Sequence, residues 1–278
     1  MVQTVSIIRV FPRRTNATPD DELVRINCAP TLFDQADEVR ISVAFTWDIP
    51  RAEQLARQWE LVAPVSMGGP AISNTADEFI AGMYIKQGYT ITSRGCGNGC
   101  WFCVERDRPV VELPIVEGHN ILDSNLLATS RQHQQNVFTM LARQKKPIEF
   151  TGGIEANRIT PWHIQQFSKL KLGQMFFAYD TPDDYEPLYY AGKMLNEIGV
   201  NYRTRKARCY VLCGYARDTF DSAHKRMIDT VKAGFMPMAM LYRDKTGQRD
   251  PEWMKWARTW ARPAIIASHI KLEGQNAA

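Results

Sequence analysis

Apolar residues alternate with polar ones in several short stretches of this 278-residue chain, a pattern that predicts β-strands with one buried face. In the N-terminal quarter the pattern predicts strands over residues 4–11, 39–47 and 61–67. Between the last two strands, apolar residues at helical spacing predict a helix over 50–60, with Pro50 where its missing N–H costs nothing. The order strand, helix, strand is typical of a small Rossmann-like βαβ piece.

Strands and helices alternate regularly from residue 88 onward, an order that favours parallel strands joined by crossover helices. The predicted strands cover residues 89–92, 120–127, 147–151, 174–179, 209–213 and 236–241, and the predicted helices cover 131–143, 161–170, 186–198 and 219–233. About six units are too few for a closed eightfold barrel and suit a partial one. We therefore expect an α/β protein, a partial (β/α)6 barrel preceded by the Rossmann-like piece.

Three regions follow from this pattern: the Rossmann-like region 1–87, the partial barrel 88–245, and a C-terminal helical extension 246–278. In the extension, Trp253, Trp256 and Trp260 recur at spacings of three and four after Pro251. Such spacing places the three rings on one side of a helix, so we interpret them as its buried face rather than as a stacking platform for bases.

The composition describes a protein that can bury a sizeable core, with 45% hydrophobic and 23% charged residues. The net charge of +4 permits an anionic partner without requiring one. We expect no secretory signal, because the N-terminus lacks a basic segment followed by an apolar run. No apolar run approaches the roughly 20 residues of a membrane span. The expected location is cytoplasmic, with no membrane partner.

Three of the six cysteines, Cys96, Cys100 and Cys103, are clustered at spacing C-x3-C-x2-C among glycines. In a reducing compartment, clustered cysteines are more often metal ligands than disulfides. Three thiolates on one loop leave a coordination position open, and an open position is where chemistry takes place. The other three cysteines are predicted to pack as small apolar side chains: Cys28, Cys209 and Cys213.

Polar groups follow nearly every predicted strand of the second region, at the strand ends where such folds bind ligands. Gly152, Gly153 and Glu155 follow strand 147–151, and this combination is suited to holding an ammonium group. Asp180 follows strand 174–179, and its carboxylate is suited to binding sugar hydroxyls. Two further polar side chains follow the last two strands: Tyr215 and Arg243.

The motif Cys96-x3-Cys100-x-Phe102-Cys103 resembles the signature of the radical S-adenosylmethionine (radical SAM) superfamily. The closest likeness is to stand-alone members with a degenerate, cobalamin-binding-like N-terminal region. The resemblance covers residues 88 to about 243. It implies that the three cysteines hold a four-iron–four-sulfur (4Fe-4S) cluster, whose fourth iron is chelated by the amino and carboxyl groups of S-adenosylmethionine (SAM).

The same resemblance implies further contacts with SAM. The Gly-Gly-x-Glu stretch maps onto the ammonium site, and the residues after the next strands map onto the ribose, carboxylate and adenine sites. The implied cofactor-binding residues are Phe102, Gly152, Gly153, Glu155, Tyr179, Asp180, Arg208, Val211 and Gly214. The family's histidine-bearing cobalamin motif is missing, since the first histidine is His119, so we expect no cobalamin.

The implied activity needs a one-electron reductant of the flavodoxin or ferredoxin type. In this family the reduced cluster cleaves SAM to methionine and a 5′-deoxyadenosyl radical, which removes a hydrogen atom from the substrate. Residues at strand ends that SAM does not use are the candidates for substrate contact: Asn120, Asp123, Asn125, Tyr215 and Arg243. The alternative for the asparagine and aspartate side chains is helix capping and turn formation.

The substrate is the least determined part of the sequence analysis. Arg203, Arg205, Lys206 and Arg208 form a basic stretch, which is either a set of solvated loop charges or a rim that grips phosphates. Short stand-alone relatives that resemble this chain occur in phage-like genomes with hypermodified DNA bases. The resemblance thus implies DNA as a partner and rearrangement of a modified base as the reaction. The alternatives are a small-molecule or peptide substrate, and a non-catalytic iron–sulfur or zinc module.

Overall fold

The computed structural model describes residues 5–72, 79–244 and 246–276. The chain forms two compact units, one of residues 1–89 with 245–247 and one of residues 90–244 with 248–278. The observed division lies two residues from the predicted boundary at 87/88. The predicted separate extension 246–278 is divided: residues 246–247 group with the first compact unit, and residues 248–278 belong to the second.

The first unit is a four-stranded parallel sheet in the order β2-β1-β3-β4. Its elements are β1 (Ile7–Phe11), β2 (Val24–Ile26), β3 (Glu38–Ser42), α1 (Ile49–Trp59) and β4 (Val65–Gly68). The buried residues Leu55 and Trp59 of α1 pack with Val39 of the sheet. The helix and the existence of the three predicted strands are confirmed, but the bounds of two strands are not: β3 ends at Ser42 and is followed by a 3-10 helix over Thr46–Asp48, and β4 begins only at Val65. Residue 4 of the first prediction lies outside the described residues. Strand β2, only three residues long, was not predicted.

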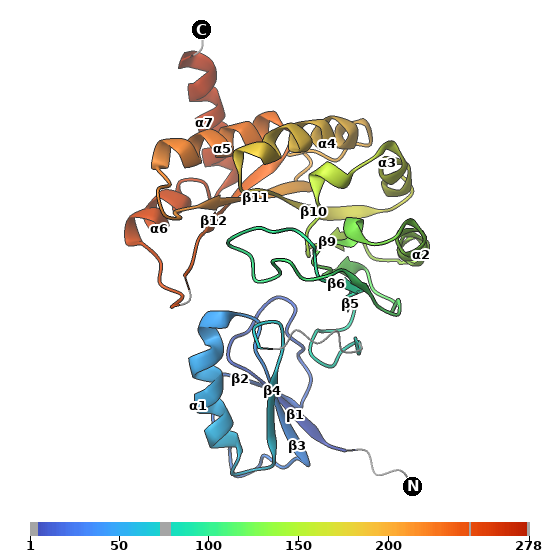
Figure 1. The fold of residues 1–278 in the computed structure, drawn as a ribbon, viewed down its shortest axis with the longest axis vertical. Coiled ribbons are helices and arrows are strands. Elements are labelled where there is room, and N and C mark those ends of the chain that lie inside the picture. Colours follow the sequence, from blue (N-terminus) through green and yellow to red (C-terminus); the bar gives the residue numbers. More distant parts are fainter. Residues whose placement is uncertain (1–4, 73–78, 245, 277–278) are drawn as a thin grey trace. The chain divides into compact units, whose positions relative to one another are not determined.

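The second unit contains a six-stranded sheet in the order β12-β11-β10-β9-β8-β5 (Figure 1). Its strands are β5 (Tyr89–Thr90), β8 (Asn120–Ile121), β9 (Ile148–Phe150), β10 (Leu172–Tyr179), β11 (Ala207–Cys213) and β12 (Met236–Leu241). Neighbouring strands from β8 to β12 pair in parallel. An α/β architecture with parallel strands, as predicted, is therefore confirmed.

Helices follow the strands of this sheet and cover one of its faces. They are α2 (Arg131–Ala142), α3 (Pro161–Phe167), α4 (Tyr185–Glu197) and α5 (Phe220–Lys232). Alternate residues of β10 and β11, such as Phe177 and Cys209, are buried in the core that these helices share. Because side chains alternate along a strand, Phe176 and Tyr210 lie on the opposite face, where their rings stack with centroids 5.3 Å apart.

The two C-terminal helices, α6 (Pro251–Arg258) and α7 (Pro263–Asn276), pack onto the second unit. The Trp253 ring lies 4.5 Å from the Phe220 ring, measured between centroids. Trp260 is buried and stacks on His269 at 4.3 Å. The three tryptophans thus pack against the protein, as predicted, but they do not form the buried face of one helix: Trp253 and Trp256 are only partly buried on α6, and the buried Trp260 lies beyond the end of α6 at Arg258. Of the helices in the described part of the chain, none combines the length and apolar character that crossing a bilayer requires.

The three clustered cysteines lie on a loop between two short antiparallel strands, β6 (Ser93–Arg94) and β7 (Val111–Glu112). We call residues 95–110 the cysteine loop. The predicted strand over 89–92 is thus shorter than expected, since β5 ends at Thr90 and the chain then turns into this hairpin.

Gly192 of α4 marks the closest approach of that helix to its neighbours. A Cβ atom at this position would lie 1.8 Å from the Ala233 carbonyl oxygen and 2.9 Å from the Phe235 ring. Overpacking of a filled interior costs roughly 1–3 kcal/mol. We therefore expect Gly192→Ala to lower the melting temperature of the second unit by about 2–10 °C, as measured by calorimetry. The matched control is Gly68→Ala, because nothing lies within 4 Å of a Cβ there; an equal effect of both substitutions would contradict the packing assignment.

Candidate functional site

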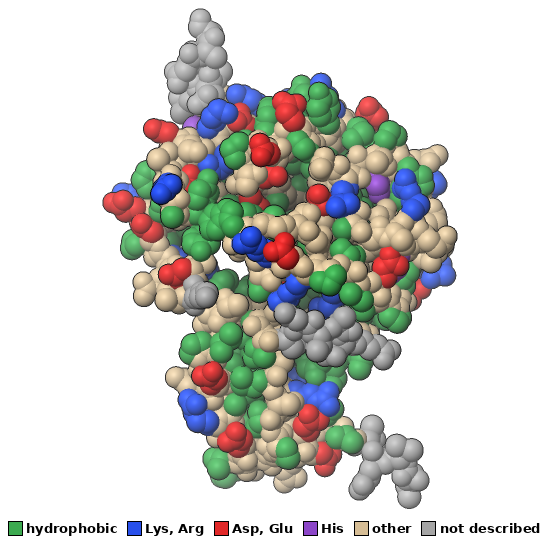
Figure 2. Space-filling model, viewed as in Figure 1, with side chains coloured by type: hydrophobic (Ala, Val, Ile, Leu, Met, Phe, Trp, Pro, Cys, Tyr) green, Lys and Arg blue, Asp and Glu red, His purple; other side chains and the backbone are tan. Residues whose placement is uncertain are grey.

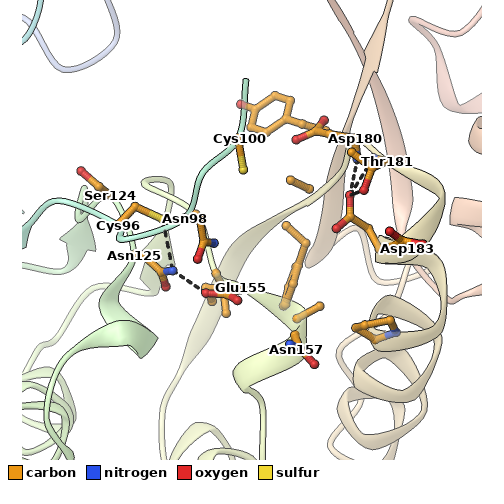
Figure 3. A pocket seen from close by; sticks show the side chains of 18 of the residues that line it. Cys96, Asn98, Cys100, Ser124, Asn125, Glu155, Asn157, Asp180, Thr181 and Asp183 are labelled. Carbon is orange, nitrogen blue, oxygen red and sulfur yellow. Dashed lines mark hydrogen bonds between the residues drawn. The ribbon is translucent and has the colours of Figure 1, made fainter. Parts of the chain in front are cut away.

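A cavity of about 450 Å³ lies in the second unit, where the cysteine loop meets the segments that follow β8, β9 and β10. Its size is within the range of small-molecule sites. Figure 3 shows the thiol of Cys96 with Asn125 and Glu155 on one side of the cavity, and Asp180, Thr181 and Asp183 on the other. Eight of the predicted site residues line this cavity: Cys96, Cys100, Phe102, Asn125, Gly152, Gly153, Glu155 and Asp180.

Backbone contacts at its base determine the shape of the cysteine loop. The N–H groups of Cys96 and Gly97 both donate to the Arg108 carbonyl oxygen, at 3.2 and 2.9 Å. Gly95 has a φ of +80°, and a Cβ there would lie 2.0 Å from the Pro109 carbonyl oxygen. Only glycine fits this close approach in the left-handed region. The two ends of the loop, residues 95–97 and 108–109, are therefore held in contact, and Cys100 and Cys103 lie in the segment between them.

Asp123 fastens the strand that leads into the cysteine loop to the end of β8. Its carboxylate is fully buried and accepts the Thr92 N–H at 2.6 Å, the Thr92 hydroxyl at 2.6 Å and the Ser93 hydroxyl at 2.8 Å. Burial raises the pKa of Asp123, and these hydrogen bonds oppose that rise. Asp123 was predicted to contact substrate, but its carboxylate is directed to the backbone of the loop's own strand.

Asn125 connects a thiol to a carboxylate across one wall of the cavity. Its Nδ2 amide donates to Cys96 Sγ at 3.4 Å and to Glu155 Oε2 at 2.6 Å. Arg158 Nε also donates to Glu155 Oε2, at 2.6 Å. The Asn125 side chain is almost fully buried, and its Oδ1 has no hydrogen-bond partner in the described part of the chain. A buried acceptor without a partner costs about 1–3 kcal/mol, which a bound donor would recover.

The two positions after β9, Gly152 and Gly153, are occupied by glycine for different structural reasons. A Cβ at Gly152 would lie 2.2 Å from the Asp123 carbonyl oxygen, so this glycine is required by backbone packing. Gly153 has a φ of +118°, and a Cβ there would meet nothing within 4 Å. Both line the cavity. Gly153 is therefore the one whose lack of a side chain leaves open space for a ligand.

Asp180 stands at the carboxyl end of β10, beside a second carboxylate. Its Oδ1 accepts the Leu212 N–H at 3.1 Å. The neighbouring Asp184 is occupied with its own turn, where it accepts the Asp180 N–H at 2.9 Å and the Thr181 N–H at 2.7 Å. Burial, and next the negative charge of Asp184, raise the pKa of Asp180 to about 7. Near neutral pH this side chain is thus divided between its acid and its carboxylate form.

The cysteine thiols lie close enough to influence one another. Burial raises the pKa of Cys100, and the charges of Cys103 and Cys96 raise it further. Burial also raises the pKa of Cys103, against the Glu105 N–H that donates to its sulfur at 3.4 Å. The raised pKa values favour the neutral thiol form of both cysteines. A bound cation favours the thiolate instead, because it binds the thiolate directly. The thiol-rich wall therefore favours a positively charged occupant.

Among the described residues, no group of three or more His, Cys, Asp or Glu side chains is arranged to hold a single metal ion. A four-iron cluster binds each cysteine through a different iron, so its ligands need not converge on one point. The donor set fits such a cluster: Cys96 and Cys100 line the cavity, and Cys103 already accepts the kind of N–H···S bond that tunes iron–sulfur centres.

An aromatic cluster attaches the cysteine loop to the opposite edge of the sheet. Trp101 contacts Tyr215, which follows β11, with ring centroids 5.7 Å apart, and Tyr242, which follows β12, at 5.5 Å. It also meets Phe102 edge-on at 5.4 Å. Tyr215 was predicted to contact substrate; the structure places it against the loop, outside the cavity wall. The Trp101 ring remains about half exposed.

Other predicted site residues lie away from the cavity. Asn120 is buried between Glu149 and Thr151. The Arg208 guanidinium lies over the Phe176 ring near the amino end of β11, 5.7 Å from its centroid. At Gly214, a Cβ would lie 2.9 Å from the Trp253 ring. Four more predicted residues, besides those already described, are not part of the lining: Tyr179 and Val211, which are in the helix-facing core, and Cys103 and Arg243.

Several cavity residues were not predicted. Tyr210 could have been found, because it alternates with the core residues of β11 and so must lie on the other face of the sheet. Asn98 and Ser124 lie in loops, and Asn157 lies in a single turn of 3-10 helix (Ala156–Arg158). Such short segments carry no period in the sequence that would show which way a side chain is directed. Comparison of the chain with protein-family models and with curated proteins finds no match.

The Asp123 contacts generate a stability prediction. Asp123→Ala leaves two hydroxyls and one N–H without their acceptor, so we expect a loss of on the order of 3 kcal/mol in the free energy of unfolding. Hydrogen exchange of residues 92–110 should also become faster. Asp123→Asn is the matched control, because its amide can accept from the Thr92 N–H and donate to the hydroxyls. Equal losses in both variants would contradict the fastening role of these hydrogen bonds.

The raised pKa of Asp180 generates a pH prediction. An acid whose pKa is higher in the folded state contributes stability that is full below the unfolded pKa of 3.8 and is lost as pH rises through about 7. We expect the free energy of unfolding to fall by about 2–3 kcal/mol between pH 5 and pH 8 because of Asp180.

Urea unfolding at the two pH values measures this loss. The loss should be absent in Asp180→Asn and unchanged in Asp183→Asn, a control at an exposed carboxylate on the same cavity wall. A wild-type slope that survives Asp180→Asn would show that another group titrates.

Proposed function

We propose that this chain is a radical SAM enzyme that holds a 4Fe-4S cluster on Cys96, Cys100 and Cys103 and binds SAM in the adjoining cavity. The observation that carries the proposal is that the motif cysteines Cys96 and Cys100, the open Gly153 and the carboxylate of Glu155 line one cavity, although they come from separate segments. The parallel sheet behind the cavity is the framework of the partial barrel that we propose.

Each proposed binding role follows from the chemistry of the cavity wall. Glu155 carries a carboxylate suited to the SAM ammonium group, beside the open space at Gly153. Asp180, on the opposite wall, can accept hydrogen bonds from the ribose hydroxyls. Phe102 supplies an aromatic surface for adenine. Cys96, Cys100 and Cys103 would hold the cluster, which, once reduced by a flavodoxin- or ferredoxin-type donor, would supply the electron for cleavage of SAM to methionine and a 5′-deoxyadenosyl radical able to abstract hydrogen from the substrate.

For the substrate, we propose a modified nucleobase in DNA, on the basis of the resemblance described above. Arg203, Arg205 and Lys206 of the basic stretch precede β11, and Arg208 is its second residue. Most of the cavity wall is formed instead by segments at the carboxyl ends of the strands. None of the four basic side chains of this stretch lines the cavity, to which β11 contributes Tyr210, so these charges do not form its wall. Basic and acidic side chains are also interspersed on the face drawn in Figure 2. DNA binding should therefore be weak, with the shallow dependence on salt that few phosphate contacts produce.

The decisive experiment is anaerobic reconstitution of the protein with iron and sulfide, followed by dithionite and SAM. We expect about four irons per chain and release of 5′-deoxyadenosine and methionine. Cys96→Ala, Cys100→Ala and Cys103→Ala should each lose both the cluster and the products. Cys28→Ala is the matched control and should keep them, because Cys28 is exposed in the other compact unit.

Two outcomes would overturn the proposal. One is a protein loaded with four irons that yields no 5′-deoxyadenosine. The other is a purified chain that binds one zinc tightly and no iron–sulfur cluster, which is the behaviour of a non-catalytic zinc module. Salt titration of duplex DNA binding tests the substrate separately: DNA binding that is absent even at low salt would count against DNA and favour a small-molecule or peptide substrate.

A further inference from the structure

The orientation of the Asn125 amide is determined by its neighbours. The carboxylate of Glu155 accepts hydrogen bonds only, so the nitrogen of the amide must be the atom 2.6 Å from Glu155 Oε2. The same nitrogen lies 3.4 Å from Cys96 Sγ. An amide nitrogen carries two hydrogens, and these two acceptors use both. The oxygen of the amide is consequently directed away from both Glu155 and Cys96.

That oxygen is a buried acceptor on a cavity wall. Asn125 is 3% exposed, its Oδ1 has no hydrogen-bond partner among the described residues, and the residue lines the cavity. Both hydrogen bonds that Glu155 accepts from described side chains go to Oε2. The wall therefore combines an unused amide oxygen with a nearby carboxylate, and a positively charged N–H donor matches both groups.

We propose that Asn125 couples the two halves of the SAM site: its amide nitrogen stabilises the Cys96 thiolate through an N–H···S hydrogen bond, and its amide oxygen accepts a hydrogen bond from the ammonium group of bound SAM. This inference rests on the proposed function. Asn125 is thus a positioning residue for the cluster ligand Cys96 and a binding residue for the amino acid part of SAM. Its two roles use different atoms of one side chain, so substitutions can separate them.

The thiolate role predicts a change in redox behaviour. An N–H···S hydrogen bond stabilises the electron-rich reduced state of an iron–sulfur centre and so raises its reduction potential. Asn125→Leu removes both roles, whereas Asn125→Asp removes the N–H donors and keeps an oxygen acceptor. We expect the midpoint potential, measured by redox titration with electron paramagnetic resonance, to become more negative in both variants. Ser124→Ala, a neighbouring position on the same wall, should leave it unchanged.

The ammonium role predicts a difference between two ligands. For Asn125→Leu we expect SAM to bind about tenfold to a hundredfold more weakly, the size of one hydrogen bond to a charged donor. Methylthioadenosine, which lacks the amino acid part, should bind wild type and variant equally. Asn125→Asp should keep the affinity for SAM within a few-fold, because it retains an acceptor. Equilibrium titration of the cluster-loaded protein measures both dissociation constants.

The outcomes separate this inference from the proposed function. If wild type forms 5′-deoxyadenosine while both Asn125 variants match Ser124→Ala in midpoint potential and SAM affinity, the coupling is wrong and the function stands. If Asn125→Leu weakens methylthioadenosine as much as SAM, the loss is a general distortion and the ammonium role is wrong. If Asn125→Leu does not fold, Asn125→Asp decides alone, and an unchanged potential in that variant overturns the thiolate role. A wild type that forms no 5′-deoxyadenosine indicates failure of the proposed function itself.

Discussion

The buried carboxylate of Asp123 is the contact from which the rest of the site is positioned. It binds the backbone and hydroxyl of Thr92 and the hydroxyl of Ser93, two residues that stand directly before the cysteine loop. Asn125, only two residues further along the chain, holds Cys96. The loop is therefore secured to the segment that follows β8 both before its first cysteine and at that cysteine. Without that attachment, a glycine-rich segment would have too much conformational freedom to present its thiols in one arrangement.

The cavity concentrates negative charge at one end of the sheet. Glu155, Asp180 and Asp184 follow two neighbouring strands, and the cysteine thiols face them. The raised pKa of Asp180 is the direct result, since burial and a second carboxylate both disfavour its charged form. A ligand that carries positive charge relieves this repulsion, whereas an anion would add to it. The electrostatics of the wall thus favour a positively charged ligand over an anion.

The sequence predicted the longer strands and the helices, because alternation and helical spacing are local signals that burial of one face enforces. The predicted strand 120–127 was wrong over most of its length: β8 covers only Asn120–Ile121, and Leu126–Ala128 form a 3-10 helix. The sequence also placed Cys96, Gly153, Glu155 and Asp180 near one another, and all four line the cavity. This was possible because parallel strands bring their carboxyl ends to one edge of the sheet. It could not show which polar side chains at that edge are directed into the cavity. Asp123 and Asn125 are both polar residues shortly after the same strand, so the sequence does not distinguish their roles. In the structure Asp123 binds residues 92 and 93, whereas Asn125 lines the cavity. Strand β2 escaped prediction because three residues are too few to show a period.

Trp101 gives the cysteine loop a second anchor, far from the first in the order of strands. The loop starts beside β5, at one edge of the six-stranded sheet, and Trp101 contacts the residues that follow β11 and β12, at the other edge. The segment therefore acts as a strap over the ends of the sheet. Trp101 stands next to Cys100, so the Tyr242 ring contacts the cysteine loop beside one of its thiols although the two residues are more than 130 positions apart in sequence.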